Sequence, residues 1–321
     1  MARAGPEKPL VAIVGPTGSG KSELAVRVAL ALDGEIINCD SLQVYRYLDI
    51  GTAKQPLAER RGVPHHLLDV LNPDEHFSAG EFARRARQVI YDISARGRLP
   101  VLAGGTGFYL RALVDGLFPG PRRNERLRAE LKRRQLRRPG VLHRWLRRHD
   151  PAAAARIHPH DVQKLIRAVE ICRLAQRPLE AVFAAGRESL EGYRVLKLGL
   201  DPPRDALYKR LDERCRQMFE GGLLDEVRRV LLLGFSPEAK ALEAHGYRQA
   251  LQLLRGELSY KEALYYAQRN TRRYAKRQWT WFRREKDLEW IKGFGWEPGV
   301  VEQALQRIRA FLQSPGSQAG S

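Results

Sequence analysis

The stretch GPTGSGKS, from Gly15 to Ser22, constrains this chain more than any other. It fits the pattern G-x-x-x-x-G-K-[ST] of a phosphate-binding loop. The apolar run 10–14 before it predicts a buried parallel strand, and Leu24 and Val28 after it fall at helical spacing. A strand, a glycine turn and a helix direct backbone N–H groups, the helix N-terminus and the lysine side chain at one anion. The stretch therefore predicts a phosphate or diphosphate site, but it does not identify what carries the phosphate.

The composition narrows the class of binding partner and the cellular compartment that we expect for this protein. The 321 residues carry a formal net charge of +19, which favours a polyanion, above all nucleic acid, although a generally arginine-rich proteome would also produce it. No apolar run is long enough to cross a bilayer, and MARAGPEKP lacks the apolar core of a secretory signal. Cys39, Cys172 and Cys215 lie far apart. We therefore expect a cytoplasmic protein with neither a disulfide framework nor a zinc finger.

A second strand is predicted at 35–39, and it ends at Asp40. Polar residues at the carboxyl end of such a strand lie on the ligand-binding edge of an α/β sheet, so Asp40 is a candidate catalytic carboxylate; the alternative is a cap of the next turn. A third strand is expected at 65–70. Its two histidines lack further ligands nearby and are expected to be structural, whereas Asp69 could hold magnesium.

A second glycine-rich turn follows a fourth predicted strand. The capping box Ser78–Glu81 predicts a helix to about Arg96, and 100–103 is an apolar strand. That strand runs into GGTG, residues 104–107, before a helix at 108–114. These glycines could bring backbone close to a ligand or merely allow tight packing, and the pattern leaves both open.

The composition shifts at Pro121. Residues 122–148 are rich in Arg and Lys, helical spacing continues through 161–174, and the next strand is expected only at 193–200. The predicted fold is therefore an α/β P-loop NTPase-like parallel sheet core, residues 9–120 and 193–313, with a basic helical insertion at 121–192. Residues 1–8 and 314–321 are expected to be flexible tails.

The C-terminal third is expected to be mostly helical. Helices are predicted at 204–219 and 223–233, with another that has Ser236 as N-cap and Pro237 in its first turn. The capping box Ser259–Glu262 opens a long helix with a predicted phosphate-contacting basic stripe, made of Arg269, Arg272, Arg273, Lys276, Arg277 and Arg284. On its core face we expect Leu264, Ala267, Tyr274 and Trp281. A last strand at 288–291 and a helix at 300–312 complete the fold.

Several motifs, in order along nearly the whole chain, resemble those of the tRNA dimethylallyltransferases, also called tRNA isopentenylpyrophosphate transferases. They are GPTGSGKS, GEIINCDSLQVYR, DIGTAK, GVPHHLLD, FSAGEF, GGTGFYL, HPHDVQKLIRAVE and KRQWTWFR. The resemblance implies transfer of a dimethylallyl group from dimethylallyl diphosphate to N6 of adenosine 37, beside the tRNA anticodon. It also implies Mg²⁺ as cofactor and a monomeric enzyme.

The resemblance also implies roles for individual residues. Asp40 is the implied general base, with Thr106 and Arg214 as further catalytic residues. The diphosphate is expected to bind Gly15, Pro16, Thr17, Gly18, Ser19, Gly20, Lys21 and Ser22, with Ser22 as the magnesium ligand. The implied tRNA contacts are Asp40, Ser41, Leu42, Gln43, Thr106, Arg128, Gln163, Lys164, Leu165, Ile166, Arg167, Glu243, Ala244, His245, Gly246, Tyr247, Arg248, Lys276, Arg277, Gln278, Trp279, Thr280, Trp281, Phe282 and Arg283.

Two positions depart from the family pattern. Gly18 stands where the family commonly has Ala, and His245 replaces an aliphatic residue before Gly-Tyr, which puts the detail of tRNA contact there in doubt. The zinc finger of eukaryotic members is lacking, which indicates a bacterial type. The nearest alternative is an adenylate isopentenyltransferase acting on free AMP, ADP or ATP. A small-metabolite P-loop kinase and a non-enzymatic RNA-binding protein are the others.

Overall fold

The chain forms two compact units in a computed structural model, whose residues 7–184 and 186–314 are described here. One unit comprises the chain up to Val114 together with the chain from Leu190 onward, and the other is Asp115–Ser189. The second unit begins and ends a few residues before the basic insertion expected from composition.

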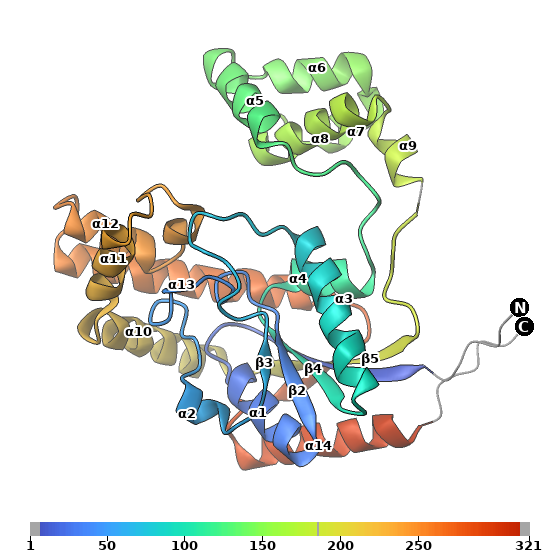
Figure 1. Cartoon of the computed structure of the whole chain (residues 1–321). Helices are drawn as coiled ribbons and strands as arrows, with labels where there is room; N and C mark the ends of the chain where they lie inside the picture. The colour runs from blue at the N-terminus through green and yellow to red at the C-terminus, as the bar shows by residue number, and fades with distance from the viewer. Residues whose placement is uncertain (1–6, 185, 315–321) are drawn as a thin grey trace, which may run out of the picture. The chain divides into compact units, whose positions relative to one another are not determined.

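The first unit is built on a parallel sheet of six strands (Figure 1). Its strand order is β3-β2-β4-β1-β5-β6, and every neighbouring pair is parallel. The strands are β1 (Lys8–Val14), β2 (Gly34–Asn38), β3 (His65–His66), β4 (Leu99–Gly104), β5 (Tyr193–Asp201) and β6 (Leu288–Lys292). The central strands β1 and β4 are almost wholly apolar, as expected for strands covered on both faces.

Helices cover both faces of this sheet. The apolar sides of α1 (Lys21–Ala31) and α14 (Pro298–Gln313) share one core with the strands. On the opposite side of the sheet lies α3 (Ala79–Ala95), which packs on α4 (Gly107–Val114) (Figure 1). Ser78 caps α3 by accepting the Glu81 N–H at 3.1 Å, but the Glu81 carboxylate pairs with Arg84 and Arg85, so only one half of the predicted capping box is formed. The sheet core expected from the sequence is thereby confirmed.

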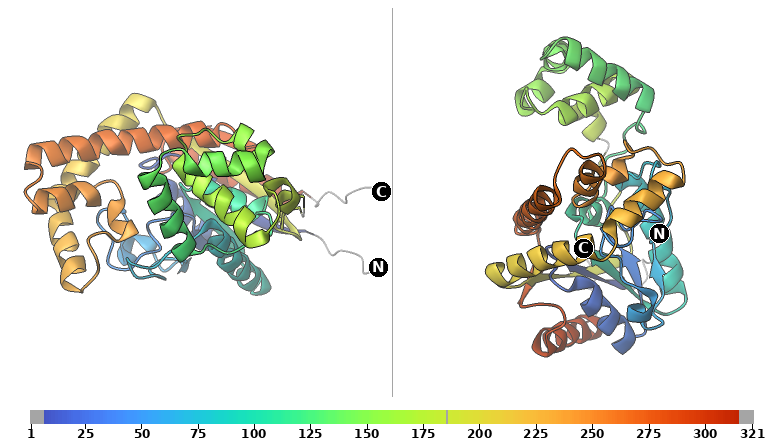
Figure 2. Two further views of the ribbon diagram at one scale, coloured as in Figure 1. Left: turned by 90° about the horizontal axis from the view of Figure 1, so that it is seen from above. Right: turned by 90° about the vertical axis from the view of Figure 1, so that its left-hand side faces the viewer.

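The remaining helices of this unit form a layer beside the sheet. They are α2 (Leu57–Arg60), α10 (Arg204–Glu220), α11 (Leu223–Leu232), the short 3₁₀ helix η1 (Lys240–Glu243), α12 (Tyr247–Leu254) and α13 (Tyr260–Phe282). Helix α13 packs against α10 and α12 (Figure 2). Ser259 and Glu262 cap α13 reciprocally, so the predicted capping box is confirmed.

The second unit is an all-helical cluster with a core of its own. It contains α5 (Glu125–Arg137), α6 (Val141–His149), α7 (Pro151–Arg156), α8 (Val162–Ala175) and α9 (Leu179–Phe183). Leu131, Leu146 and Leu165 lie in its core. The fully buried Glu170 accepts the Asn124 N–H and pairs with Arg128 and Arg167. This internal network stabilises a unit whose surface is strongly basic.

Three local expectations are wrong. The strand at 65–70 is only His65–His66, and β1 already begins at Lys8, inside the expected tail; residues 1–6 and 315–321 of the two expected tails lie outside the described residues. No helix starts at Pro237: Ser236 accepts the Glu238 N–H in a local turn, and Ala239 is extended. Burial of Ala239 with Leu242 directs the chain inward, and the next α-helix starts at Tyr247. In the described ranges no helix is long and apolar enough to span a membrane.

Candidate active site

The phosphate loop, Gly15–Ser22, connects β1 to α1 at the carboxyl edge of the sheet. Gly18 and Gly20 have φ of 81° and 88°, which side chains rarely adopt. A Cβ on Gly20 would lie 2.6 Å from the Trp296 ring, and a Cβ on Gly18 would lie 2.7 Å from Leu211 Cδ2. The alanine common at position 18 would therefore need Leu211 to shift in this chain. Glycine here is required by both conformation and space.

Three polar side chains at the phosphate loop could each donate a further hydrogen bond to a bound anion. Lys21 Nζ donates to the Pro16 carbonyl at 2.8 Å, and burial lowers the pKa of Lys21 to about 8, against an opposing effect of Asp40. Ser19 Oγ and Arg214 Nε are buried with no hydrogen-bond partner among the described residues. Buried polar groups without partners are costly and rare. A bound diphosphate would supply acceptor oxygens to all three.

Arg214 reaches the loop from α10. Its Nη2 donates to Thr17 Oγ1 at 2.8 Å, and burial lowers the pKa of the guanidinium group. The structure thus brings Arg214 to the phosphate loop although 192 residues separate it from Ser22 in the sequence. Arginine at such a place offers a fixed fork of donors to phosphate oxygens.

The second glycine turn, Gly104–Gly107, is filled by the protein's own atoms. A Cβ on Gly104 would lie 2.1 Å from the Cys39 carbonyl oxygen, and one on Gly105 would lie 2.2 Å from Gln278 Nε2. A Cβ on Gly107 would lie 2.1 Å from the Trp281 ring. Of the two readings open from the sequence, the structure supports tight packing.

Gln278, on α13, connects the two turns. Its Oε1 accepts the Thr17 N–H at 2.7 Å, and its Nε2 donates to the Gly105 carbonyl at 2.9 Å. The side chain is buried, so both hydrogen bonds are shielded from water. This single amide connects two turns whose strands, β1 and β4, are already paired at Val14 and Gly104.

Asp40 lies where the two turns meet. Its backbone is held by Asn38, whose Oδ1 accepts the Asp40 N–H at 3.1 Å, and its Oδ1 accepts the Leu42 N–H at 2.9 Å. The cap-like contact expected as an alternative is therefore present. Oδ2 has no hydrogen-bond partner in the described part of the chain, so one carboxylate oxygen is available. The charge of Asp40 acts on Lys21 and Arg214.

Thr106 and Tyr274 complete the surroundings of Asp40. Thr106 Oγ1 accepts the Ser41 N–H at 3.1 Å. Burial together with the charge of Asp40 raises the pKa of Tyr274, and Thr106 opposes this effect. The same burial raises the pKa of the Cys39 thiol, so Cys39 is no thiolate nucleophile. Cys39, Cys172 and Cys215 are all buried and free.

The DIGTAK motif has a structural role. The buried Glu226 of α11 accepts the N–H groups of Asp49, Ile50 and Gly51 and the hydroxyl of Tyr247. The buried Lys54 bonds to the Tyr45 carbonyl and pairs with Asp49 and Asp69. Since Asp69 serves Lys54, its expected role as a magnesium carboxylate is not supported.

The two histidines of β3 are structural, as expected. His66 Nε2 lies 2.6 Å from Glu35 Oε2, and His65 Nδ1 lies 2.8 Å from the Val63 carbonyl. Among the described residues no cluster of three His, Cys, Asp or Glu could hold a metal ion.

Several residues expected to contact tRNA point into the protein. Leu165 and Ile166 belong to the core of the second unit. Tyr247 and Phe282 are fully buried, and Trp279 is 7% exposed, its Nε1 donating to Asp201 at 2.9 Å. Helical periodicity explains the correction, since a continuous motif on a helix necessarily includes inward positions. The exposed members of these segments are Gln163, Lys164, Glu243, Arg248, Lys276, Arg277, Thr280 and Arg283.

Most of the other expected tRNA contacts are partly buried, and Gln278 is buried. Gln43 Nε2 donates to the Thr52 carbonyl, Arg128 pairs with Glu170, and Arg167 Nη2 donates to the Pro121 carbonyl. His245 lies 3.4 Å from Arg277 Nη2, with its ring 5.2 Å from the Tyr274 ring. Burial and Arg277 lower the pKa of His245. Arg128 and Arg167 are thus occupied within their own unit.

The basic stripe of α13 is present but is shorter than expected. Arg272 pairs with Asp212 of α10, and Arg269 stacks over the Tyr266 ring. The other members line an open groove of about 800 Å³ with Thr280, Trp281 and Arg111 of α4. The core-face expectation was wrong for Trp281, whose ring lies in this groove with Arg111 Cζ 4.6 Å from its centroid.

The contacts of Gln278 and Tyr274 were not predicted from the sequence, which indicates a tRNA contact for Gln278 and a core position for Tyr274. Helical periodicity could have predicted that Tyr274 and Gln278 share a face, because they are one turn apart and lie opposite Lys276 on the helix.

Known proteins match this arrangement over nearly the whole chain. The model of the IPP transferase family matches residues 43–285. A curated relative, the tRNA dimethylallyltransferase of Solibacter usitatus, is 64% identical over 304 residues, covering 95% of this chain and 99% of the relative.

Solved structures agree with this match. The tRNA isopentenylpyrophosphate transferase of Bacillus halodurans is 39% identical, with 95% of each chain covered and a TM-score of 0.69. A eukaryotic dimethylallyltransferase acting on tRNA is 28% identical with a TM-score of 0.84, covering 97% of this chain and 81% of that one. The chain belongs to the IPP transferase family of transferase enzymes.

Proposed function

We propose that this enzyme transfers the dimethylallyl group of dimethylallyl diphosphate to N6 of adenosine 37 in tRNA. The observation that carries the proposal is the meeting of an anion-binding loop and an oriented carboxylate, Asp40, at one sheet edge. The names of the relatives support both substrates, since they are called tRNA dimethylallyltransferases. The product is N6-dimethylallyladenosine, and diphosphate is the leaving group.

The donor half of the reaction takes place at the phosphate loop. As the C–O bond to diphosphate breaks, its electron pair leaves with the diphosphate, whose negative charge grows. Lys21, Arg214 and the loop N–H groups stabilise that charge more in the transition state than in the ground state. The buried Ser19 hydroxyl adds a donor that has no partner within the described residues.

Magnesium fits this site as an ion held chiefly by the substrate. Mg²⁺ often keeps several waters and binds substrate phosphates with only one or two protein ligands, so the lack of a three-residue metal cluster in the described ranges is compatible with it. Ser22, exposed on the first turn of α1, would be the protein ligand. The bound ion would supply neutralisation of diphosphate charge.

The acceptor half requires a base. The N6 amine of adenine is a poor nucleophile because its lone pair is delocalised into the ring. As the new N–C bond forms, the N6 proton passes to Asp40, which commonly accelerates such a step by about 10²–10⁴-fold. Thr106 and Asn38 position the segment that carries Asp40. The adenine must leave the anticodon-loop stack to reach this site, at a cost of a few kcal/mol.

The RNA is held by exposed cations. Arg273, Lys276, Arg277 and Arg284 line one groove, and contacts of this kind with phosphates dominate the affinity of proteins for nucleic acids. The exposed residues Gln163, Lys164, Glu243 and Arg248 are proposed tRNA contacts as well. The enzyme is proposed to act as a monomer in the cytoplasm, where its three free cysteines stay reduced.

One assay tests the proposal. The protein is incubated with Mg²⁺ and dimethylallyl diphosphate, together with either unmodified tRNA or AMP, and the nucleosides are analysed by mass. We expect one dimethylallyl group in place of one hydrogen on a tRNA adenosine, and no product from AMP. Transfer to AMP alone would favour an adenylate isopentenyltransferase. ATP turnover with a phosphorylated product would favour a kinase, and tRNA binding without product a non-enzymatic protein.

A further inference from the structure

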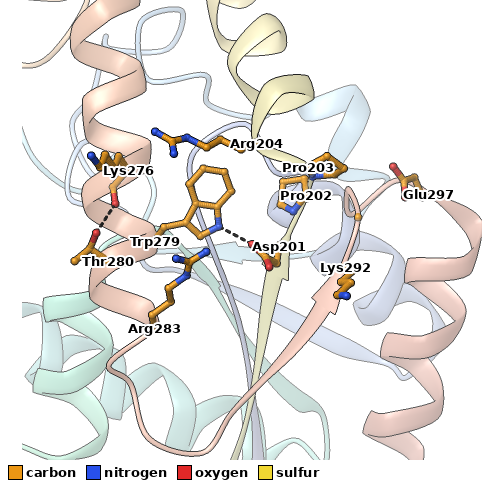
Figure 3. A pocket seen from close by; sticks show the side chains of 11 residues that line it. Asp201, Pro202, Pro203, Arg204, Lys276, Trp279, Thr280, Arg283, Lys292 and Glu297 are labelled. Atoms are coloured by element: carbon orange, nitrogen blue, oxygen red, sulfur yellow. Dashed lines mark hydrogen bonds between the residues drawn. The ribbon is translucent and has the colours of Figure 1, made fainter.

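A second cavity, of about 620 Å³, lies beside α13 at the carboxyl ends of β5 and β6 (Figure 3). One wall is the face of α13 that carries Lys276, Trp279 and Arg283. The others are the segments that follow β5, with Arg204, and β6, with Lys292. No residue of the phosphate loop lines this cavity, so it is separate from the proposed diphosphate site.

The floor of the cavity is rigid and aromatic. The Trp279 ring packs with Leu207, Leu211 and Phe294, and its indole N–H donates to Asp201 Oδ1 at 2.9 Å. Asp201 is further held through its carbonyl, which accepts the Gly293 N–H at 3.3 Å. Hydrogen bonds and packing therefore hold the Trp279 ring and Asp201 in place under the cavity.

The residues that line the cavity carry more positive than negative charge. Four cations line it, Arg204, Lys276, Arg283 and Lys292, against the carboxylates Asp201 and Glu297. None of these cations forms a salt bridge within the described ranges, although many arginines there do. In Figure 3 the guanidinium groups of Arg204 and Arg283 lie on either side of the Trp279 ring. Arg204 Cζ also lies 5.1 Å from the centroid of the Tyr208 ring. Cations without carboxylate partners around one cavity favour an anionic ligand.

The cavity is continuous with the basic groove. Lys276 and Thr280 line both, so these two residues form a ridge between them. The cations are exposed, and exposed charges bind a single small anion weakly because water screens them. A strand that crosses the ridge would place phosphates in both hollows at once, and such contacts add to its affinity.

We propose that this cavity receives a backbone phosphate of the RNA substrate, with Arg204 and Lys292 as RNA contacts outside the α13 motif. The inference rests on the proposed function, because it takes tRNA as the substrate. It extends the RNA surface from one helix to the carboxyl ends of two strands. These ends also position the phosphate loop, since the Gly295 N–H donates to the Ser19 carbonyl at 2.9 Å.

The test is a double variant, Arg204→Ala with Lys292→Ala. Its matched control is Arg229→Ala with Arg309→Ala, two exposed arginines on α11 and α14 that form no salt bridge within the described residues. Affinity for unmodified tRNA is measured between low and moderate salt, without donor. We expect the double variant to bind tRNA about ten-fold more weakly and its log–log salt slope to fall by about one to two units. The control should change neither.

Two results would overturn the inference. One is an unchanged tRNA affinity and salt slope in the double variant. The other is an increase in KM for dimethylallyl diphosphate with tRNA affinity unchanged, which would assign the cavity to the donor. Failure of the proposed function is distinguishable from both, because then wild-type protein would modify no tRNA adenosine. Thermal unfolding of both variants checks that each is folded.

Discussion

The two glycine turns of this protein lie at the same sheet edge but have different uses. In the phosphate loop, Ser19 Oγ has no partner among the described residues, and Lys21 has a pKa lowered by burial. In the second turn, as in the phosphate loop, protein atoms occupy the space that side chains would need, but the groups there are Cys39, Gln278 and Trp281, none of which is a cation. The comparison teaches that glycine alone does not identify a ligand site. The phosphate loop differs from the second turn in the buried cations beside it, Lys21 and Arg214.

Asp40, which lies between the turns, should give the largest effect. Asp40→Asn keeps the shape and the hydrogen bond to the Leu42 N–H but removes the base. We expect turnover to fall by about 10²–10⁴-fold, with tRNA affinity changed little. Single-turnover assays and tRNA binding measure the two quantities. Unchanged turnover would remove Asp40 as the base.

A substitution in the second glycine turn should lower the stability of the fold. In Gly104→Ala the new methyl group would collide with the Cys39 backbone, and we expect the free energy of unfolding to fall by about 2–3 kcal/mol. Gly299→Ala is the control, since a Cβ there meets nothing within 4 Å. Chemical denaturation measures both. Equal stability of the two variants would contradict tight packing at the second turn.

One substitution can remove the two hydrogen bonds by which Gln278 connects the glycine turns. Gln278→Leu leaves the Thr17 N–H and the Gly105 carbonyl without their partner. We expect KM for dimethylallyl diphosphate to rise about ten-fold, or about 1.4 kcal/mol. The matched control is Gln268→Leu on the same helix, which loses only a bond to the Asp212 carbonyl. Similar donor KM values in both variants would show that Gln278 only stabilises the fold.

The smallest expected effect is the change of kcat/KM for the donor with pH. Lys21 has a pKa of about 8, below its ordinary value because of burial. Loss of its charge weakens diphosphate binding, so kcat/KM for the donor should fall about two-fold between pH 7 and pH 8. Because the folded state binds fewer protons than the unfolded state above this pKa, unfolding free energy should rise with pH there.

Lys21→Arg tests this assignment, because arginine stays charged over the range. Its kcat/KM profile should be flat between pH 7 and pH 8, whatever its absolute value. A decline of the same size in this variant would place the titrating group elsewhere.

Much of the site could be predicted from local patterns. The phosphate loop, the position of Asp40 at a strand end and the N-caps of α3 and α13 depend on neighbouring residues. The prediction of a helix with Ser236 as its N-cap was wrong, because burial of Ala239 and Leu242 overrides the local capping signal. Inward residues such as Trp279 and Phe282 were assigned to RNA contacts because a contiguous motif does not state which helix face is buried.

The sequence by itself determined the parallel sheet, the anion site and the family resemblance, because these depend on short-range spacing and on motifs in order. Only the tertiary structure decided that the second glycine turn is tightly packed and that Gln278 connects the two turns. It alone brought Arg214 to Thr17 and placed Arg204 and Lys292 around one cavity. Those relations join residues far apart in the chain, and their geometry is set by how helices pack on the sheet.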